Sequence, residues 1–139
     1  MVVWGSGGTL RLIGEILGYD LTLLGIDIQH KDKIYTDLNE KQLIEILEQH
    51  AGSKLLLLSP MGGQGFLIGR GNLQLSPAVL RLIGIKSILG VATPAKLTGL
   101  SNVRIDTGDG KLDQELRERK FVKMLQGYRT TRVIRVSDV

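Results

Sequence analysis

The sequence has 139 residues, 42% hydrophobic and 23% charged, which predicts one globular domain and excludes a disordered tail, a coiled coil and a collagen-like fibre. No apolar run reaches the roughly 18–20 residues of a membrane-spanning helix, and without cysteine and with only two histidines a disulfide framework or a multi-histidine metal centre is excluded. The net charge of +4 arises in residues 111–139, which hold eight of the eighteen basic residues and four of the fourteen acidic ones. With 4% aromatic residues, we interpret this charge as a solvated strand face, with residues 132–136 as a half-exposed edge strand, and not as a nucleic-acid surface.

Residues 2–4 predict a short core strand, and residues 10–17 a helix whose apolar positions share one face and which ends at Gly18. We expect a second buried strand over residues 22–28, then a small hairpin or excursion over 31–36. Because the sequence begins within a predicted core strand and shows no targeting peptide, we expect an upstream portion and a cytoplasmic location.

A helix is expected from the cap Asn39 to Gly52, with Gln42 in the capping-box position. Residues 54–59 predict a buried parallel strand, and 66–72 are ambiguous. Ser76 and Pro77 indicate a helix that runs to about Gly84. We then expect a strand over 86–92, a loop or helical turn over 94–100, a strand over 103–106, a helix over 111–119 and two strands over 121–136.

This alternation of strands and helices predicts an α/β fold, with a mostly parallel sheet, flanking helices and a small C-terminal β element. Right-handed crossovers would place the strand-end loops on one edge, where such sheets bind ligands. Eighteen glycines are well above the usual share of about 7%, and they cluster at these predicted strand ends.

The first glycine cluster, Gly5-Ser6-Gly7-Gly8-Thr9, lies between a strand and a helix. Its backbone N–H groups, the positive helix end and two hydroxyls suit a phosphate, although a tight turn without a ligand is the alternative. It is neither a Walker A loop nor the dinucleotide fingerprint, since no Lys-Ser/Thr follows and Leu10 stands where the third glycine would be.

The second cluster holds five glycines in ten residues, with the candidate binding residues Gly62, Gly63, Gln64, Gly65, Arg70 and Asn72. So many glycines cost backbone entropy, so close approach to a ligand is the preferred interpretation. Arg70 can pair with a phosphate or a carboxylate, or form a surface salt bridge.

Four further side chains lie at or just after the ends of predicted strands. Asp27 can hold a hydroxyl or move a proton, or cap a turn. Lys96 can neutralise a phosphate or remain solvated. Asp106 and Asp109 suit Mg²⁺ with waters, but we favour a turn with Asp109 as helix cap.

Together these loops resemble the C-terminal half of the ATP-NAD kinase-like family, which includes the AcoX-type proteins and predicted ATP- or polyphosphate-dependent NAD kinases. The resemblance covers nearly the whole chain, and residues 62–72, GGQGFLIGRGN, are its most specific part. The family's GGDGT kinase motif belongs to an upstream domain and is absent here. The resemblance therefore implies a C-terminal domain that acts with an upstream kinase-like domain or a separate subunit.

A more distant similarity of fold concerns the ribose-5-phosphate isomerase and CoA-transferase type. It would assign a sugar phosphate to residues 5–9 and reaction roles to Asp27 and Lys96, although the isomerase's paired acids are not reproduced after Asp27.

We expect a nucleotide- or phosphate-binding domain, with Mg²⁺ accompanying ATP or NAD and no metal held by the chain. The alternatives are a sugar-phosphate enzyme and a non-catalytic oligomerisation domain. Because an isolated half-protein would expose the surface that packed its partner, a homo-oligomer, namely a dimer, is expected. A membrane partner is not expected.

Overall fold

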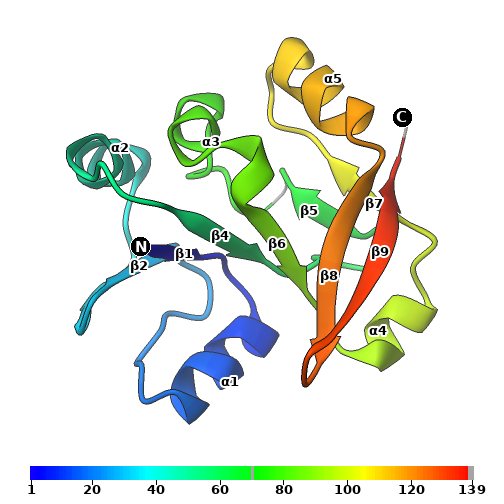
Figure 1. The fold of residues 1–139 in the computed structure, drawn as a ribbon, viewed down its shortest axis with the longest axis horizontal. Coiled ribbons are helices and arrows are strands. Elements are labelled where there is room, and N and C mark those ends of the chain that lie inside the picture. Colours follow the sequence, from blue (N-terminus) through cyan, green and yellow to red (C-terminus); the bar gives the residue numbers. More distant parts are fainter. Residues whose placement is uncertain (70, 138–139) are drawn as a thin grey trace.

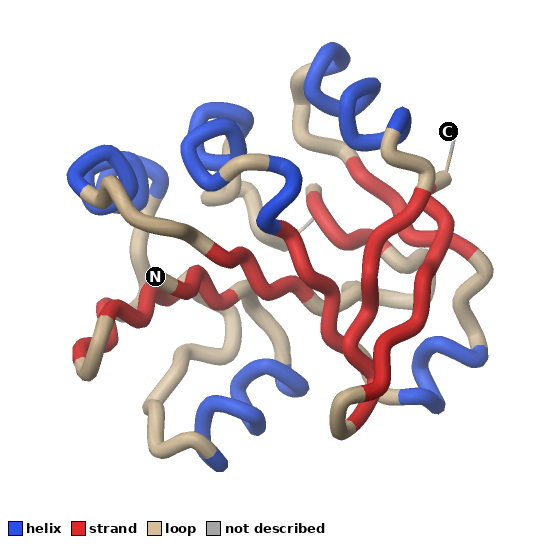
Figure 2. The backbone as a smooth tube through the Cα atoms, in the orientation of Figure 1, coloured by secondary structure: helices blue, strands red, loops and turns tan. Residues whose placement is uncertain are grey.

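The computed structural model describes residues 1–69 and 71–137. Its elements in chain order are β1 (Val2–Trp4), α1 (Gly8–Ile16), β2 (Asp27–His30), β3 (Lys33–Tyr35), α2 (Glu40–Gln49), β4 (Leu55–Leu58), β5 (Phe66–Ile68), α3 (Pro77–Ile83), the 3₁₀ turn η1 (Ile85–Ser87), β6 (Ile88–Val91), α4 (Pro94–Thr98), β7 (Asn102–Ile105), α5 (Gly110–Glu118), β8 (Phe121–Gly127) and β9 (Thr130–Val136). In Figure 1, α2, α3 and α5 lie along one side of the strands and α1 and α4 along the other. Figure 2 shows the strands as one layer between them.

The strands form one nine-stranded sheet in the order β3-β2-β1-β4-β6-β8-β9-β7-β5. The pairs β1–β4, β4–β6, β6–β8, β7–β9 and β5–β7 are parallel, and the other three pairs are antiparallel. This mostly parallel sheet with flanking helices confirms the predicted α/β class. In the part of the chain that the structure describes, no helix combines the length and the apolar character needed to cross a membrane.

Asn39, Ser76 and Gly18 lie at helix ends in the structure, as the sequence predicts. The Asn39 side chain accepts from the Gln42 N–H at 2.9 Å while the Gln42 side chain accepts from the Asn39 N–H at 3.0 Å, so α2 has a complete capping box. Ser76 caps α3, with Pro77 in its first turn. Gly18, at φ +86, follows the end of α1 in a left-handed conformation that suits glycine.

The prediction of a strand over residues 22–28 is wrong, because β2 begins only at Asp27. The Thr22 N–H and hydroxyl donate to the Asp27 carboxylate at 2.7 and 2.8 Å, which folds residues 22–26 into a turn. β2 then runs antiparallel to β1, with Asp27 opposite Trp4. Asp27 therefore starts a strand and does not end one.

The basic C-terminal hairpin is part of the sheet interior and not its edge. β8 pairs with β6 on one side, and β9 pairs with β8 and, through Arg135 and Val136, with β7. The prediction of an edge strand over residues 132–136 is therefore wrong. Because β8 and β9 are antiparallel and lie between the two groups of parallel strands, β7 and β5 run opposite to β1, β4, β6 and β8.

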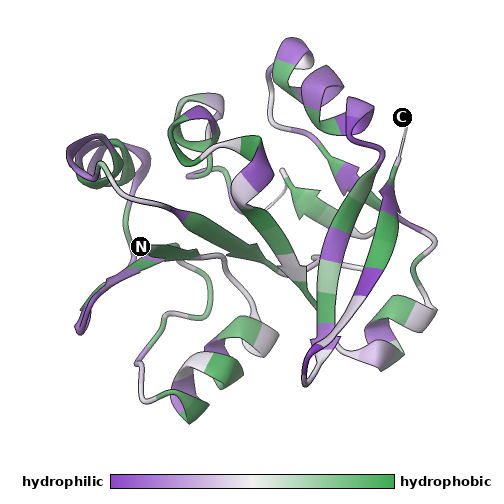
Figure 3. Cartoon of the chain, viewed as in Figure 1, coloured by the Kyte–Doolittle hydropathy of each residue, from purple (hydrophilic) through white to green (hydrophobic). Residues whose placement is uncertain are grey.

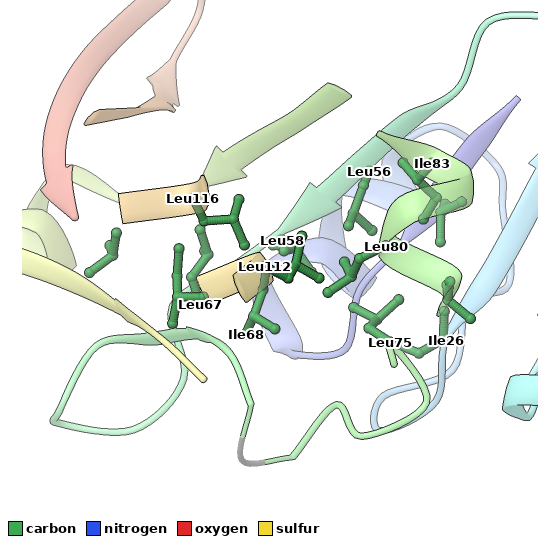
Figure 4. Packing of buried hydrophobic residues seen from close by; sticks show 14 of the residues in the cluster. Ile26, Leu56, Leu58, Leu67, Ile68, Leu75, Leu80, Ile83, Leu112 and Leu116 are labelled. Atoms are coloured by element: carbon green, nitrogen blue, oxygen red, sulfur yellow. The ribbon is translucent and has the colours of Figure 1, made fainter. Parts of the chain in front are cut away.

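Buried aliphatic side chains hold the helices to the sheet, and Figure 3 shows hydrophobic colours along β1 and β4. The larger cluster joins Leu56 and Leu58 of β4 to Leu80 of α3 and Leu112 of α5 (Figure 4). A smaller cluster packs α1 on the sheet through Leu10, which is buried. The predicted single buried face of α1 holds only in part, since Ile16 and Leu17 are 78% and 58% exposed.

Candidate functional site

Three loops meet where the parallel neighbours β1, β4 and β6 end: residues 5–9, 59–65 and 92–96. The shared edge follows from the strand directions, as predicted for these loops. Asp27 lies at the same edge by another route, because it begins a strand antiparallel to β1. Two glycine clusters that are about fifty residues apart in sequence are thus neighbours in the fold.

The first loop leads into α1 without a side-chain cap. Gly7 is the N-cap residue, at φ +122, and no side chain bonds the first turn from that position. The first N–H groups of a helix have no partner within the helix and carry partial positive charge. The N-terminal end of α1 therefore presents N–H donors at the edge of the sheet where β1 ends, near Ser6 and Thr9.

The glycines at this edge are there for different reasons. A Cβ on Gly5 would lie 2.8 Å from the Leu57 carbonyl oxygen, so the approach of β1 to β4 requires glycine there. Gly62 has φ +63, which favours glycine. Gly8 and Gly63 have neither a positive φ nor any atom within 4 Å of an added Cβ. Their lack of a side chain leaves bare backbone at the surface and has no packing reason.

Met61 joins three glycine-containing segments. The Ser6 hydroxyl lies 3.9 Å from the Met61 sulfur. On the other side, a Cβ on Gly71 would lie 3.2 Å from the same sulfur. Although β5 runs opposite to β4, the turn after β5 thus returns to the loop that precedes it. Sequence reasoning did not identify Met61, because nothing in its local context distinguishes it.

Lys96 lies over the start of the second glycine loop. Its ammonium donates to the Pro60 carbonyl from the first turns of α4, which Thr93 caps by accepting from the Lys96 N–H at 3.3 Å. An ammonium has three donors, so one bond to a carbonyl leaves two for a ligand. The fixed positive charge and the bare N–H groups are the features of this edge that suit an anion.

The Asp27 carboxylate accepts three hydrogen bonds from groups of the chain itself. It is 1% exposed, and its oxygens accept from the Thr22 N–H and hydroxyl and from the Asp37 N–H at 2.7–2.8 Å. A carboxylate with three such bonds fixes the turn over residues 22–26 against Asp37. These contacts favour the structural alternative for Asp27 over an acid, base or hydroxyl-binding role.

Asn72 also makes its hydrogen bonds within the chain. It is 2% exposed, accepts from the Gly69 N–H at 2.8 Å and donates to the Leu67 carbonyl at 3.1 Å. It therefore closes the turn after β5. Its predicted neighbour in the site, Arg70, lies outside the described residues.

The predicted Asp106–Asp109 loop lies at the other edge of the sheet, because β7 runs opposite to β1. The expectation that all strand-end loops share one edge is wrong for this loop. Asp109 caps α5, accepting from the N–H groups of Lys111 and Leu112 at 2.9 and 3.3 Å. These bonds lower the pKa of Asp109, and the bond from the Leu112 N–H has the largest effect. The Arg81 guanidinium at 3.5 Å lowers this pKa further.

Behind this cap is an acid that sequence reasoning missed. Asp113 is 7% exposed and accepts from the Thr107 N–H and hydroxyl at 2.9 and 2.6 Å. Within residues 1–69 and 71–137, no three His, Asp or Glu side chains gather as a metal site would require. The carboxylates of Asp109 and Asp113 thus accept from the protein's own backbone N–H groups.

A family model described as the ATP-NAD kinase C-terminal domain matches residues 9–136. The chain belongs to the ATP-NAD kinase C-terminal domain family. Comparisons with curated proteins and with solved structures give no match. The family match includes the second glycine loop, Asp27, Asn72 and Lys96, whereas Gly5 to Gly8 precede it.

Proposed function

We propose that this domain binds the phosphate groups of a nucleotide, ATP or NAD, at the edge formed by the ends of β1, β4 and β6. The observation that carries the proposal is the meeting of two glycine loops at one edge, each with a bare glycine, Gly8 or Gly63, that packing does not require. Membership of the ATP-NAD kinase C-terminal domain family supports a nucleotide as the ligand.

In this proposal the chain binds and positions, and does not react covalently. N–H groups of the first turn of α1 and of residues 62–64 would donate to phosphate oxygens, with the Ser6 and Thr9 hydroxyls beside them. Lys96 would neutralise charge with the donors that Pro60 leaves free. Preorganised donors of this kind act by orientation and electrostatics.

Phosphorylation of NAD would also need the GGDGT motif, which this sequence lacks. We propose that an upstream domain or a separate subunit supplies it. Since the described residues form no carboxylate cluster, Mg²⁺ would arrive with the phosphates and not be held by this chain.

The test is thermal melting with NAD, NADP, ATP, polyphosphate, ribose 5-phosphate and inorganic phosphate, each with and without Mg²⁺. A ligand at about 100 times its Kd adds roughly 2.7 kcal/mol to the free energy of unfolding. We expect a nucleotide to raise the Tm of this chain by several degrees. Stabilisation by ribose 5-phosphate alone would support the isomerase-like alternative.

Gly63→Ala and Gly8→Ala are the diagnostic variants, because an added Cβ at either position meets no atom within 4 Å. We expect both to fold normally and to bind a nucleotide at least tenfold more weakly. Gly65→Ala is unsuitable, since Gly65 has φ +72 and its Cβ would lie 2.9 Å from Leu100. Unchanged affinity in both diagnostic variants would contradict the proposal.

A homo-oligomerisation domain is the second candidate, and exposed apolar side chains favour it. Leu12, Ile16 and Leu17 of the α1 segment and Leu24 of the following turn are each more than half exposed. Light scattering after size exclusion, with Ile16→Glu as the variant, tests this alternative: it requires an oligomer that the variant dissociates.

A further inference from the structure

A cavity of about 380 Å³ lies at the edge of the sheet opposite to the glycine loops. The strands β4, β6 and β8 begin there, whereas β5 and β7 end there, so residues from all of them line it. Its floor is apolar and buried: Leu67, Ile68, Ile105 and Leu116 are each at most 5% exposed. Nothing in the proposed nucleotide site uses this space.

The rim of the cavity is positively charged. Lys86, Arg119 and Lys123 are exposed lining residues, and none of the lining residues is acidic. Arg119 donates to the Ile85 carbonyl, which fixes its guanidinium at the mouth. Within the part of the chain that the structure describes, no ion pair joins Lys86, Arg119 or Lys123 to a carboxylate.

The rim also exposes large apolar side chains beside the cations. Phe121 and Val133 line the cavity and are 50% and 56% exposed. Val133 of β9 lies directly opposite Lys123 of β8, so an apolar group and an ammonium share one face of the hairpin. The excess positive charge of residues 111–139 is thus partly gathered at the mouth of an apolar cavity.

These observations define the chemistry of a ligand. A neutral hydrocarbon would fill the floor but leave the cations without a partner, and a free inorganic anion would leave the floor unfilled. We propose that the cavity binds an amphipathic anion, a single alkyl chain with a carboxylate or phosphate head. The chain contacts the buried aliphatic floor, and the head is held by Lys86, Arg119 and Lys123. The volume lies at the small end of the roughly 300–1,000 Å³ usual for ligand sites, which favours a medium-length chain.

Isothermal titration calorimetry with four probes tests this site, with the two amphipathic anions kept below their critical micelle concentrations. Decanoate and decyl phosphate carry both chain and charge and differ in the head group, 1-decanol carries the chain alone, and inorganic phosphate the charge alone. We expect at least one of the two amphipathic anions to bind at least tenfold more tightly than 1-decanol and inorganic phosphate. The tighter of the two identifies the head group.

Two sets of variants locate the binding. Lys86→Met with Lys123→Met keeps the apolar stems and removes two charges, and we expect at least a tenfold loss of affinity for the anion with 1-decanol unchanged. Val133→Trp, at an exposed position, should obstruct the mouth and weaken every chain-bearing probe. Lys41→Met, on the exposed surface of α2, is the matched control and should change nothing.

Three results would overturn the proposal: no binding of either anion, binding of 1-decanol as tight as that of the tighter anion, or unchanged affinity for that anion in the Lys86 and Lys123 double variant. Since the cavity and the glycine loops lie at opposite edges of the sheet, Gly8→Ala and Gly63→Ala should leave decanoate affinity unchanged. Failure of this proposal is therefore distinguishable from failure of the nucleotide proposal.

Discussion

The beginnings of α1 and α5 are similar in sequence, but only α5 has a carboxylate that caps its first N–H groups. Both helices have nine residues and begin with a glycine, Gly8 or Gly110, at which an added Cβ meets nothing within 4 Å. α5 is closed by the Asp109 carboxylate, which accepts from two N–H groups of its first turn. α1 has Gly7 as its cap residue and no side-chain acceptor. One helix end is neutralised by the protein's own anion, whereas the other stays available for an external one.

The strongest test of the closed end is removal of its buried acid. Asp113→Ala removes a carboxylate that is 7% exposed, which leaves the Thr107 N–H without its acceptor and the Thr107 hydroxyl with only the Asp109 carbonyl at 3.2 Å. Since hydrogen bonds to a charged group contribute about 1.5–3 kcal/mol each, we expect the free energy of unfolding to fall by about 3 kcal/mol in urea denaturation. Glu115→Ala on the same helix is the control, because its exposed ion pair with Arg81 contributes under about 1 kcal/mol. Equal losses would remove the special role of Asp113.

Lowering the pH should weaken the Asp109 cap at the start of α5 gradually. The pKa of Asp109 is lowered in the folded state, first by the Leu112 N–H, so its contribution to stability is present above the ordinary value of 3.8. It is lost as the pH falls through the lowered value, because the unfolded state then binds the proton more tightly. Asp109→Asn keeps an oxygen for the cap but does not ionise. Thermal melting from pH 6 to pH 2.5 should therefore show a smaller decline for the variant than for the native chain.

A carboxylate placed at the start of α1 should cause the smallest change in stability but a large loss of nucleotide affinity. Gly8→Asp places an anion in the first turn of α1, which should stabilise the fold by about 0.3–1 kcal/mol. The same carboxylate would occupy and repel the phosphate position, so nucleotide affinity should fall more than tenfold. Gly110→Ala changes the matched position of α5 and should leave affinity unaltered. If Gly8→Asp bound a nucleotide as well as the native chain, the end of α1 would not be the phosphate site.

The sequence predicted the features that depend on neighbouring residues. Asn39 with Gln42, and Ser76 with Pro77, form caps within four residues, so their helix starts could be recognised. The alternation of elements also predicted the α/β class and the shared edge of the loops after β1, β4 and β6. These conclusions need only local chemistry and the handedness of crossovers.

Features that depend on distant contacts could not be predicted in this way. The late start of β2 results from bonds between Thr22 and Asp27, and the insertion of β8 and β9 depends on pairing with strands up to some thirty residues away. Likewise, Gly5 and Gly8 look equivalent in sequence. Only the Leu57 carbonyl of β4 shows that the first is required by packing. Whether the loops bind a ligand stays a prediction.

The position of β9 has a consequence for the order in which the fold can be completed. β5 and β7 precede it in the sequence, yet their place in the sheet depends on β9. Among the described residues, β7 pairs with β5 on one side and with β9, through Asn102–Arg135 and Val103–Val136, on the other. During synthesis these two strands must therefore wait, unpaired with the rest of the sheet, until the last hairpin has emerged. Such late, long-range closure slows folding and leaves strand edges exposed to other chains. The hairpin thus acts as the closing step of folding, and the interval before it forms is when this chain is most prone to aggregate.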